Sequence, residues 1–327
     1  MTYINIPVTS PLSCPPDQVL VSVIIPAFNA AATIARAIES VRSQRRVRGI
    51  EIIIIDDGSS DDTLEVIHSQ IRAGENISVH KLPSNRGVSA ARNVGIASAS
   101  GKYLAFLDAD DIWLGDKLTK QIALIESAPG IALVSCNSQL RSAAGVALKE
   151  GHVNRPPVEG DEAWKTLLIY NFLPTPTVLT HTSFVKELGG FDESLPVGED
   201  LDLWIKLGIR GKIVIHSEIL INYYDMNNSL MKRHHAQSRA IVVPMLEKHI
   251  KEQSAKLTAA EVRHIRGRHS FQIGCDIFFS GNYRSSIPLF VQSALHGTRP
   301  IKSMSYVPRA IAMELVGRVK QAAGFNK

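Results

Sequence analysis

Three short groups of acidic residues could do chemistry, because each adjoins a predicted buried strand or amphipathic helix. Asp108, Asp110 and Asp111 directly follow the apolar segment 103–107. Neighbouring carboxylates repel one another and need a compensating cation, and their hard oxygen atoms suit Mg²⁺ or Mn²⁺, ions that usually bridge a protein to substrate phosphates. A capped, solvated turn is the alternative, but three acids after a buried strand favour a metal site.

The other two acidic groups have a second explanation. Asp57 follows the apolar segment 51–56 and could hold a base or a ribose, although its Asp-Asp-Gly-Ser sequence also favours a turn. Glu199 and Asp200 precede a predicted helix, whose dipole stabilises acidic side chains with or without a function. The functional interpretation of these two groups depends on the presence of the acids at 108–111.

Strands and helices alternate in the part of the chain that must position these acids. Apolar runs predict the strands, and 3.6-residue periodicity predicts the helices. Such alternation implies a mainly parallel sheet covered by helices on both faces, with a ligand crevice at the carboxyl ends of its strands. The predicted strands are 21–26, 51–56, 78–82 and 103–107, and the predicted helices are 33–44 with Thr33 as N-cap, 61–73 and 89–99.

The alternation of strands and helices changes beyond Asp116. Taken along its whole length, the sequence predicts three parts of the chain. The later elements are a helix to about residue 127, a strand at 131–137, a less regular region at 156–180, a strand at 212–224, and helices from about 234 with breaks at 281–282 and 298–300. The expected parts are an irregular lead-in at 1–19, an α/β domain at 20–230 and a helical extension at 231–327.

The composition is that of an ordinary globular protein, with 45% apolar and 20% charged residues, so neither disorder nor a coiled coil is expected. The three cysteines are too widely spaced for a metal cluster or a disulfide framework, which is typical of a reducing cytoplasm. The sequence shows no signal peptide and no apolar run of about 18 residues. We expect a cytoplasmic protein, soluble or held peripherally at the inner face of the membrane.

Basic residues concentrate late in a chain whose formal net charge is +5, at 232–235, 263–268 and 299–320. They are compatible with contact with a polyanionic surface, with a solvated basic surface as the alternative that the composition favours, and nucleic acid is not an expected partner. Residues 278–295 resemble half of a tetratricopeptide-like helix pair, which cannot form a solenoid alone. Residues 301–325 mix apolar and basic side chains, as does a helix on a membrane surface or a helix docked on the protein.

Several motifs occur together in a fixed order, and in this combination the chain resembles glycosyltransferase family 2 over about residues 20–225. The resemblance implies a GT-A fold, a nucleoside-diphosphate-sugar donor and an inverting single displacement. The Gln-x-x-Arg-Trp pattern of processive members is missing, which favours transfer of single sugars. The motifs are Val21–Asn29, Ile55–Thr63, Asn85–Asn93, Asp108–Asp111, Gly189–Asp192 and Glu199–Asp200.

The resemblance also assigns the donor site by position. Pro26, Ala27 and Asn29 resemble the loop that lines the nucleotide base, and Asp57 resembles the acid that hydrogen-bonds a pyrimidine ring. Arg86 and Arg92 follow the third strand, where a guanidinium could meet phosphate. A surface salt bridge is the alternative for each arginine.

The same comparison implies the roles of the acids. Asp110 and Asp111 resemble the ribose- and metal-binding acids, with Asp108 in support, and the expected metal is Mn²⁺ or Mg²⁺. Asp200 resembles the general base that takes the proton of the acceptor hydroxyl, and Glu199 its neighbour that orients the acceptor. A family pattern, Tyr-Arg-x-His, is replaced by Tyr-Tyr-Asp-Met at 223–226, so the Arg and His that could bind phosphate or metal in that loop are missing.

The sequence therefore predicts transfer of a sugar from a UDP- or dTDP-sugar to a saccharide or lipid-linked acceptor, in polysaccharide or lipid-linked oligosaccharide biosynthesis. One alternative is a nucleotidyltransferase, which should carry a Gly-rich, basic loop after the first strand. Residues 26–32 contain neither glycine nor a cation. A non-catalytic sugar-nucleotide-binding protein is the other alternative, and the complete set of acids at 108–111 and 199–200 argues against it.

Overall fold

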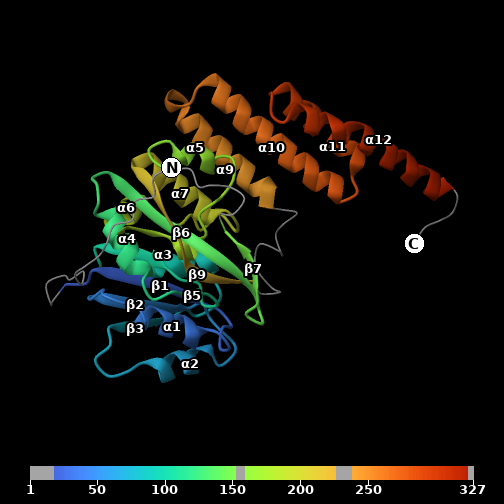
Figure 1. Ribbon diagram of the computed structural model, residues 1–327. Helices are drawn as coiled ribbons and strands as arrows, with labels where there is room; N and C mark the ends of the chain where they lie inside the picture. Colours follow the sequence, from blue (N-terminus) through green and yellow to red (C-terminus); the bar gives the residue numbers. More distant parts are fainter. Residues whose placement is uncertain (1–17, 152–158, 226–237, 323–327) are drawn as a thin grey trace. The chain divides into compact units, whose positions relative to one another are not determined.

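The computed structural model describes residues 18–151, 159–225 and 238–322. The chain divides into two compact units, Met1–Arg233 and His234–Lys327. The first unit contains all three acidic groups and is built around a sheet with helices on both faces (Figure 1).

The described residues of the first unit form one nine-stranded sheet with the order β3-β2-β1-β4-β8-β6-β9-β5, and β7 pairs with β6. The strands β3, β2, β1 and β4 are parallel, as the alternating pattern predicts. Beyond β4 the sheet is mixed, because β8 is antiparallel to both β4 and β6. The strands are β1 Val21–Ala27, β2 Ile50–Asp56, β3 Ile77–Lys81, β4 Tyr103–Phe106, β5 Ile112–Trp113, β6 Ile131–Ser142, β7 Ala147–Glu150, β8 Leu179–His181 and β9 Lys212–Asp225.

Side chains of β1 alternate between two apolar layers, because successive residues of a strand point to opposite faces. Val23 and Ile25 belong to the core that α1, α2 and α4 complete. Ile24 points to the other face, where a Cβ atom on Gly95 of α3 would lie 2.7 Å from its methyl group. Glycine therefore allows α3 to lie directly on the sheet. The helices of this unit are α1 Ile34–Arg42, α2 Thr63–Gln70, α3 Val88–Ser98, α4 Lys117–Ile125, α5 Ala163–Leu167, α6 Thr182–Glu187 and α7 Glu199–Arg210, with the 3₁₀ helix η1 Thr175–Thr177.

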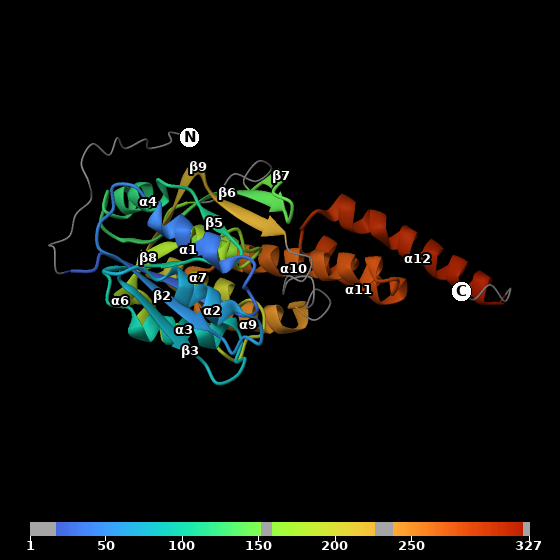
Figure 2. The ribbon, with the colours of Figure 1, turned by 90° about the horizontal axis from the view of Figure 1, so that it is seen from below.

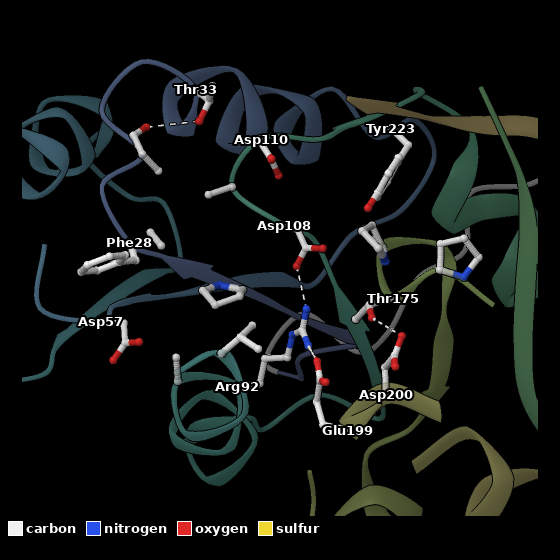
Figure 3. A pocket seen from close by; sticks show the side chains of 18 of the residues that line it. Phe28, Thr33, Asp57, Arg92, Asp108, Asp110, Thr175, Glu199, Asp200 and Tyr223 are labelled. Carbon is white, nitrogen blue, oxygen red and sulfur yellow. Dashed lines mark hydrogen bonds and ion pairs between the residues drawn. The ribbon is translucent and has the colours of Figure 1, made fainter. Parts of the chain in front are cut away.

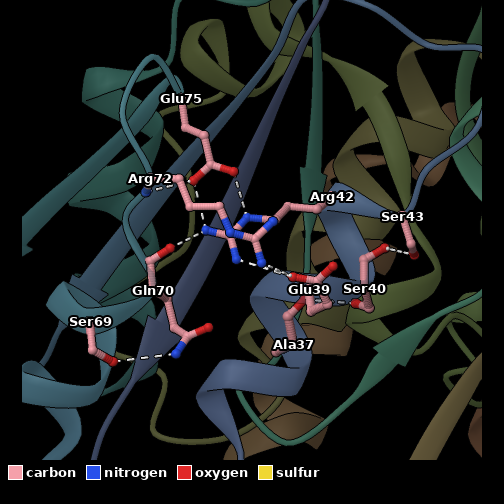
Figure 4. A network of polar contacts seen from close by, with 9 residues as sticks. All are labelled: Ala37, Glu39, Ser40, Arg42, Ser43, Ser69, Gln70, Arg72 and Glu75. Atoms are coloured by element: carbon pink, nitrogen blue, oxygen red, sulfur yellow. Dashed lines mark hydrogen bonds and ion pairs between the residues drawn. The ribbon is translucent and has the colours of Figure 1, made fainter.

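The predicted boundaries hold within a few residues in the first half, with two differences. Thr33 is the N-cap residue of α1, but its hydroxyl bonds to the carbonyl oxygen of Ala30 and does not cap the helix. The helix predicted at 61–73 ends at Gln70. Beyond its end, Arg42 of α1 binds both carboxylate oxygens of Glu75 at 2.7 Å, which fixes the α2–β3 loop to α1 (Figure 4).

The second half is more regular than predicted. The strand expected at 131–137 continues to Ser142 and then pairs with β7, so that β7, β6 and β9 form a ribbon at one side of the sheet (Figure 2). The described part of region 156–180 contains α5, η1 and most of β8. These short elements lie outside any periodic pattern.

The second unit is helical, with breaks where the sequence predicts them and a further, unpredicted break between α9 and α10. Thr258 starts α10 with a capping box to Glu261, and the ring of Phe290 stacks on Tyr306 at a centroid distance of 4.7 Å. No helix of the described residues is long and apolar enough to span a membrane. The helices are α9 Ser238–Glu252, η2 Ser254–Lys256, α10 Ala259–Phe279, α11 Tyr283–Leu295 and α12 Pro300–Ala322.

Candidate active site

A cavity of about 1440 Å³ lies at the carboxyl ends of β1 and β4 in the first unit (Figure 3). Its wall includes nine of the eleven residues that the sequence assigns to a site. This volume exceeds the roughly 300–1,000 Å³ of a pocket for one small ligand. The cavity therefore has room for two substrates. The nine residues are Pro26, Ala27, Asn29, Asp57, Arg92, Asp108, Asp110, Glu199 and Asp200.

One end of the cavity is formed by the loop after β1. Asn29 has a positive φ of 49°, a conformation that asparagine tolerates, and its side-chain oxygen accepts a 2.9 Å hydrogen bond from the backbone N–H of Ser60. Between Ala27 and Asn29, the ring of Phe28 lines the cavity and is 47% exposed. Phe28 was not among the predicted site residues, although an aromatic side chain in a loop after a buried strand is a usable signal.

Asp57 lies at the same end and is held by backbone groups. Its carboxylate accepts hydrogen bonds from the N–H groups of Arg86 at 2.8 Å and Gly87 at 2.9 Å. Burial raises its pKa above the ordinary value, and these two hydrogen bonds oppose the rise. Arg86 contributes its backbone rather than its side chain, since its guanidinium forms an exposed ion pair with Glu193 and does not line the cavity.

The acids after β4 face in different directions. Asp108 and Asp110 line the cavity. Burial, and then the charge of Asp108, raises the pKa of Asp110 to about 6. Asp111 is 1% exposed, is absent from the cavity wall, and accepts a 3.0 Å hydrogen bond from the backbone N–H of Tyr224. The structure thus brings two of the three predicted acids into the cavity.

Arg92 connects the acids after β4 with those of α7. Its guanidinium donates to Asp108 at 2.8 Å and to Glu199 at 3.1 Å, and the side chain is 4% exposed (Figure 3). Burial alone would lower the pKa of Arg92, but the charges of Asp108 and Glu199 raise it above the ordinary value. This is a buried ion bridge and not the surface salt bridge considered as an alternative.

Glu199 and Asp200 form the first turn of α7, after Gly198 with a φ of 83°. The carboxylate of Asp200 accepts hydrogen bonds from Asn171 Nδ2 at 2.9 Å and from the Thr175 hydroxyl at 3.4 Å. Burial, and then the negative charge of Glu199, raises the pKa of Asp200 to about 6. Asn171 and Thr175 were missed, because no motif or periodicity marks the region between α5 and β8.

Tyr223 and Tyr224 stand where the sequence departs from the family pattern Tyr-Arg-x-His. Tyr223 lines the cavity, and burial raises the pKa of its hydroxyl, with a further rise caused by Asp108. The ring of Tyr224 carries the guanidinium of Arg36, 4.2 Å from its centroid. Met226 lies outside the described residues.

A divalent metal fits these residues if a substrate supplies further ligands. Within the described ranges no group of three or more His, Cys, Asp or Glu side chains is arranged to hold an ion. Asp108 and Asp110 nevertheless present two carboxylates to the cavity, and burial, followed by the charge of Asp108, raises the pKa of Asp110. Mg²⁺ and Mn²⁺ commonly combine one or two carboxylates with water and substrate phosphates.

Comparison with known proteins places this site in a class. Residues 22–168 match glycosyl transferase family 2. The chain is 32% identical over 207 residues to the Escherichia coli UDP-Glc:alpha-D-GlcNAc-diphosphoundecaprenol beta-1,3-glucosyltransferase WfaP, covering 63% of this chain and 76% of that protein. The chain therefore belongs to glycosyl transferase family 2 and is a glycosyltransferase. The nucleotidyltransferase alternative has no support in these matches.

Solved structures confirm the GT-A fold. Staphylococcus aureus TarS 1–349 in complex with UDP-GlcNAc has a TM-score of 0.57 at 19% identity, covering 91% of this chain and 92% of that one. The mannosyltransferase PcManGT from Pyrobaculum calidifontis, in complex with GDP-Man and Mn²⁺, has a TM-score of 0.56 at 18% identity, covering 95% and 90%.

Proposed function

We propose that this enzyme transfers a sugar from a UDP- or dTDP-sugar to an acceptor hydroxyl, with inversion at the anomeric carbon. The observation that carries the proposal is the arrangement of one cavity, in which Asp57 lies at one end, Asp108 and Asp110 lie centrally, and Asp200 is held by hydrogen bonds at the other side (Figure 3). A donor and an acceptor can bind together in this volume.

The donor half binds the nucleotide. In this proposal Phe28 stacks on the base, Asp57 accepts a hydrogen bond from it, and Asp108 and Asp110 would hold a divalent metal. Asp111 supports this turn from behind through its bond to Tyr224. When bound, the metal would neutralise negative charge on the departing diphosphate.

The acceptor half supplies the base. The acceptor oxygen attacks the anomeric carbon while its proton passes to Asp200, and the electron pair of the breaking C–O bond stays on the diphosphate. Asn171 and Thr175 fix the receiving carboxylate by their hydrogen bonds. A pKa of about 6 suits this task, since Asp200 is ionised at neutral pH yet more basic than an ordinary aspartate.

The pathway proposed is polysaccharide or lipid-linked oligosaccharide biosynthesis. The acceptor named for WfaP, which carries a lipid-linked sugar, supports this choice. Peripheral membrane contact is part of the proposal, because α12 exposes Ile311 and Leu315 on one stripe and carries exposed Lys302 and Arg309 on another. Basic and apolar side chains together suit an anionic membrane surface.

The test is Asp200→Asn, after a panel of nucleotide-sugars has been screened for hydrolysis with Mn²⁺ to find the donor. Asparagine keeps the size of the side chain but cannot accept the proton. Turnover should fall by about a hundredfold or more, while donor affinity changes little. Turnover within a few-fold of wild type would exclude Asp200 as the base and make Glu199 the next candidate. A parallel loss of donor affinity would place Asp200 in the nucleotide site.

A further inference from the structure

The ribbon of β7, β6 and β9 presents one face to the cavity. Lys149 of β7 pairs with Leu140 of β6, and Leu140 pairs with Tyr223 of β9. Directly opposed residues of neighbouring strands point to the same face of a sheet. Lys149 and Tyr223 both line the cavity, as this register requires.

Register also separates the backbone of Lys149 from that of Tyr223. Neighbouring strands lie about 4.8 Å apart, so two strand spacings put the Cα atoms of Lys149 and Tyr223 about 10 Å apart. The β9 side of this ribbon adjoins the acids after β4, because the backbone N–H of Tyr224, next to Tyr223, bonds to Asp111. Lys149 therefore belongs to the part of the cavity beyond the acids after β4.

Charge makes Lys149 unusual in this wall. In the described ranges the other cation that lines the cavity is Arg92, and its guanidinium is occupied by Asp108 and Glu199. The exposed ammonium of Lys149 has no ion pair with any described residue. It is thus available to an anion that enters the cavity.

The surroundings of Lys149 suit an amphiphilic ligand. The rings of Tyr170 and Phe172 line the cavity with centroids 5.7 Å apart. On the hairpin that carries Lys149, Val146 is 62% exposed and Leu148 is 54% exposed, and both lie outside the cavity wall, where they could contact a part of the ligand that extends out of the cavity. A Cβ atom on Gly151, the next cavity-lining residue after β7, would lie 2.8 Å from the Ser138 hydroxyl, so glycine keeps the hairpin close to β6.

We propose that Lys149 binds a phosphate group of the acceptor, and that the acceptor is a saccharide joined to a lipid through diphosphate. Tyr170 and Phe172 contact the saccharide, while Val146 and Leu148 lie beside the lipid. This inference rests on the proposed function, because it assigns the acceptor subsite of the same cavity. It makes Lys149 a specificity-determining residue that the transfer chemistry itself does not require.

The experiment measures binding of a lipid diphosphate to enzyme that already holds nucleotide. Geranyl diphosphate is titrated by calorimetry into protein saturated with UDP, with equal UDP and free Mn²⁺ in cell and syringe. Geraniol, which lacks the charge, is the ligand control. Lys149→Gln removes the charge, Lys149→Arg keeps it, and Lys212→Gln is the matched control, because Lys212 is an exposed lysine at the other end of β9, 3.9 Å from Asp161.

Geranyl diphosphate should bind the UDP-loaded wild type, and Lys149→Gln should weaken it about tenfold, as expected for loss of one hydrogen bond between charged groups. Lys149→Arg and Lys212→Gln should stay within about twofold of wild type, and UDP affinity should not change.

The proposal is wrong if UDP-loaded wild type does not bind geranyl diphosphate or if Lys149→Gln binds it equally well. It is also wrong if Lys149→Gln weakens UDP several-fold, which would make Lys149 a donor ligand. Failure of the proposed function would be seen separately, as a lack of binding of UDP and every nucleotide-sugar to wild type.

Discussion

The Nδ2 atom of Asn171 lies 2.9 Å from Oδ2 of Asp200 and connects the segment before η1 to the first turn of α7. This hydrogen bond stabilises the ionised carboxylate and so lowers the pKa of Asp200, against the larger effects of burial and of Glu199. The base form of Asp200 is lost as the pH falls through about 6. We therefore expect kcat of the wild type to fall below about pH 6.

Replacement of Asn171 by Ala should move this acidic limb to higher pH, because the carboxylate loses a donor. At neutral pH kcat should fall several-fold, mainly because the carboxylate is no longer held in place, while UDP affinity stays the same. Thr175→Val removes the longer, 3.4 Å contact and should cause a smaller shift in the same direction. The measurement is kcat against pH for the three proteins. Identical profiles would mean that Asn171 does not position the base.

Substitutions at Arg92 and Arg86 form a matched pair that tests how much a buried and an exposed ion pair contribute to the free energy of unfolding. Arg92→Gln leaves Asp108 and Glu199 without their buried cation, and breaking a buried ion bridge costs about 3–5 kcal/mol. Arg86→Gln breaks an exposed pair, which should cost about 0–1 kcal/mol and spare the backbone bond to Asp57. Urea unfolding of both variants gives the comparison. Equal midpoints would show that the bridge through Arg92 contributes no net stability.

The first half of the fold could be predicted, because its information is local. Apolar strands and periodic helices mark β1 to β4, and the acids at their carboxyl ends follow from topology. The antiparallel position of β8 could not be predicted, since it depends on pairing with β4 and β6, far apart in sequence. Adjacency in sequence does not fix direction either, because neighbours in a tight turn point in different directions: Asp111 lies outside the cavity wall, and its role as a metal ligand stays a prediction.

Several of the residues that were missed lie outside the motifs, unlike Phe28, which lies within Val21–Asn29. Asn171 and Lys149 lie in segments without periodicity, and nothing in their types marks them. Their relevance arises from contacts: a hydrogen bond to Asp200 for one, and a place across the ribbon from Tyr223 for the other. Such contacts become visible only when the second half of the sheet is assembled.

Nucleotide binding should depend on a divalent metal. Calorimetry with UDP should show an affinity at least tenfold higher with Mn²⁺ than with chelator, because a diphosphate and the carboxylates of Asp108 and Asp110 repel one another without a cation. Asp110→Asn should remove most of this difference. Asp111→Asn should change it less, since Asp111 does not line the cavity.

Two results would contradict this assignment. Equal UDP affinity with Mn²⁺ and with chelator would mean that no metal is used. A larger loss for Asp111→Asn than for Asp110→Asn would mean that Asp111 turns into the cavity when donor binds. The melting temperature of each variant should be measured alongside, because the buried carboxylate of Asp111 accepts a backbone bond from Tyr224.

The last prediction concerns the two faces of α12. Ser303 and Ala310, seven residues apart, are buried, whereas Met304, Ile311 and Leu315 are exposed on a different stripe. The double variant Ile311→Ser, Leu315→Ser should bind vesicles of anionic phosphatidylglycerol at least tenfold more weakly than wild type, because it removes apolar area from the contact. Wild-type binding should itself weaken with salt and on neutral phosphatidylcholine, since Lys302 and Arg309 supply part of the attraction. Hydrolysis of nucleotide-sugar in solution should be unaffected and serves as the control for folding. Sedimentation with vesicles decides the matter, and a wild-type protein that stays in the supernatant at low salt would rule out this membrane contact.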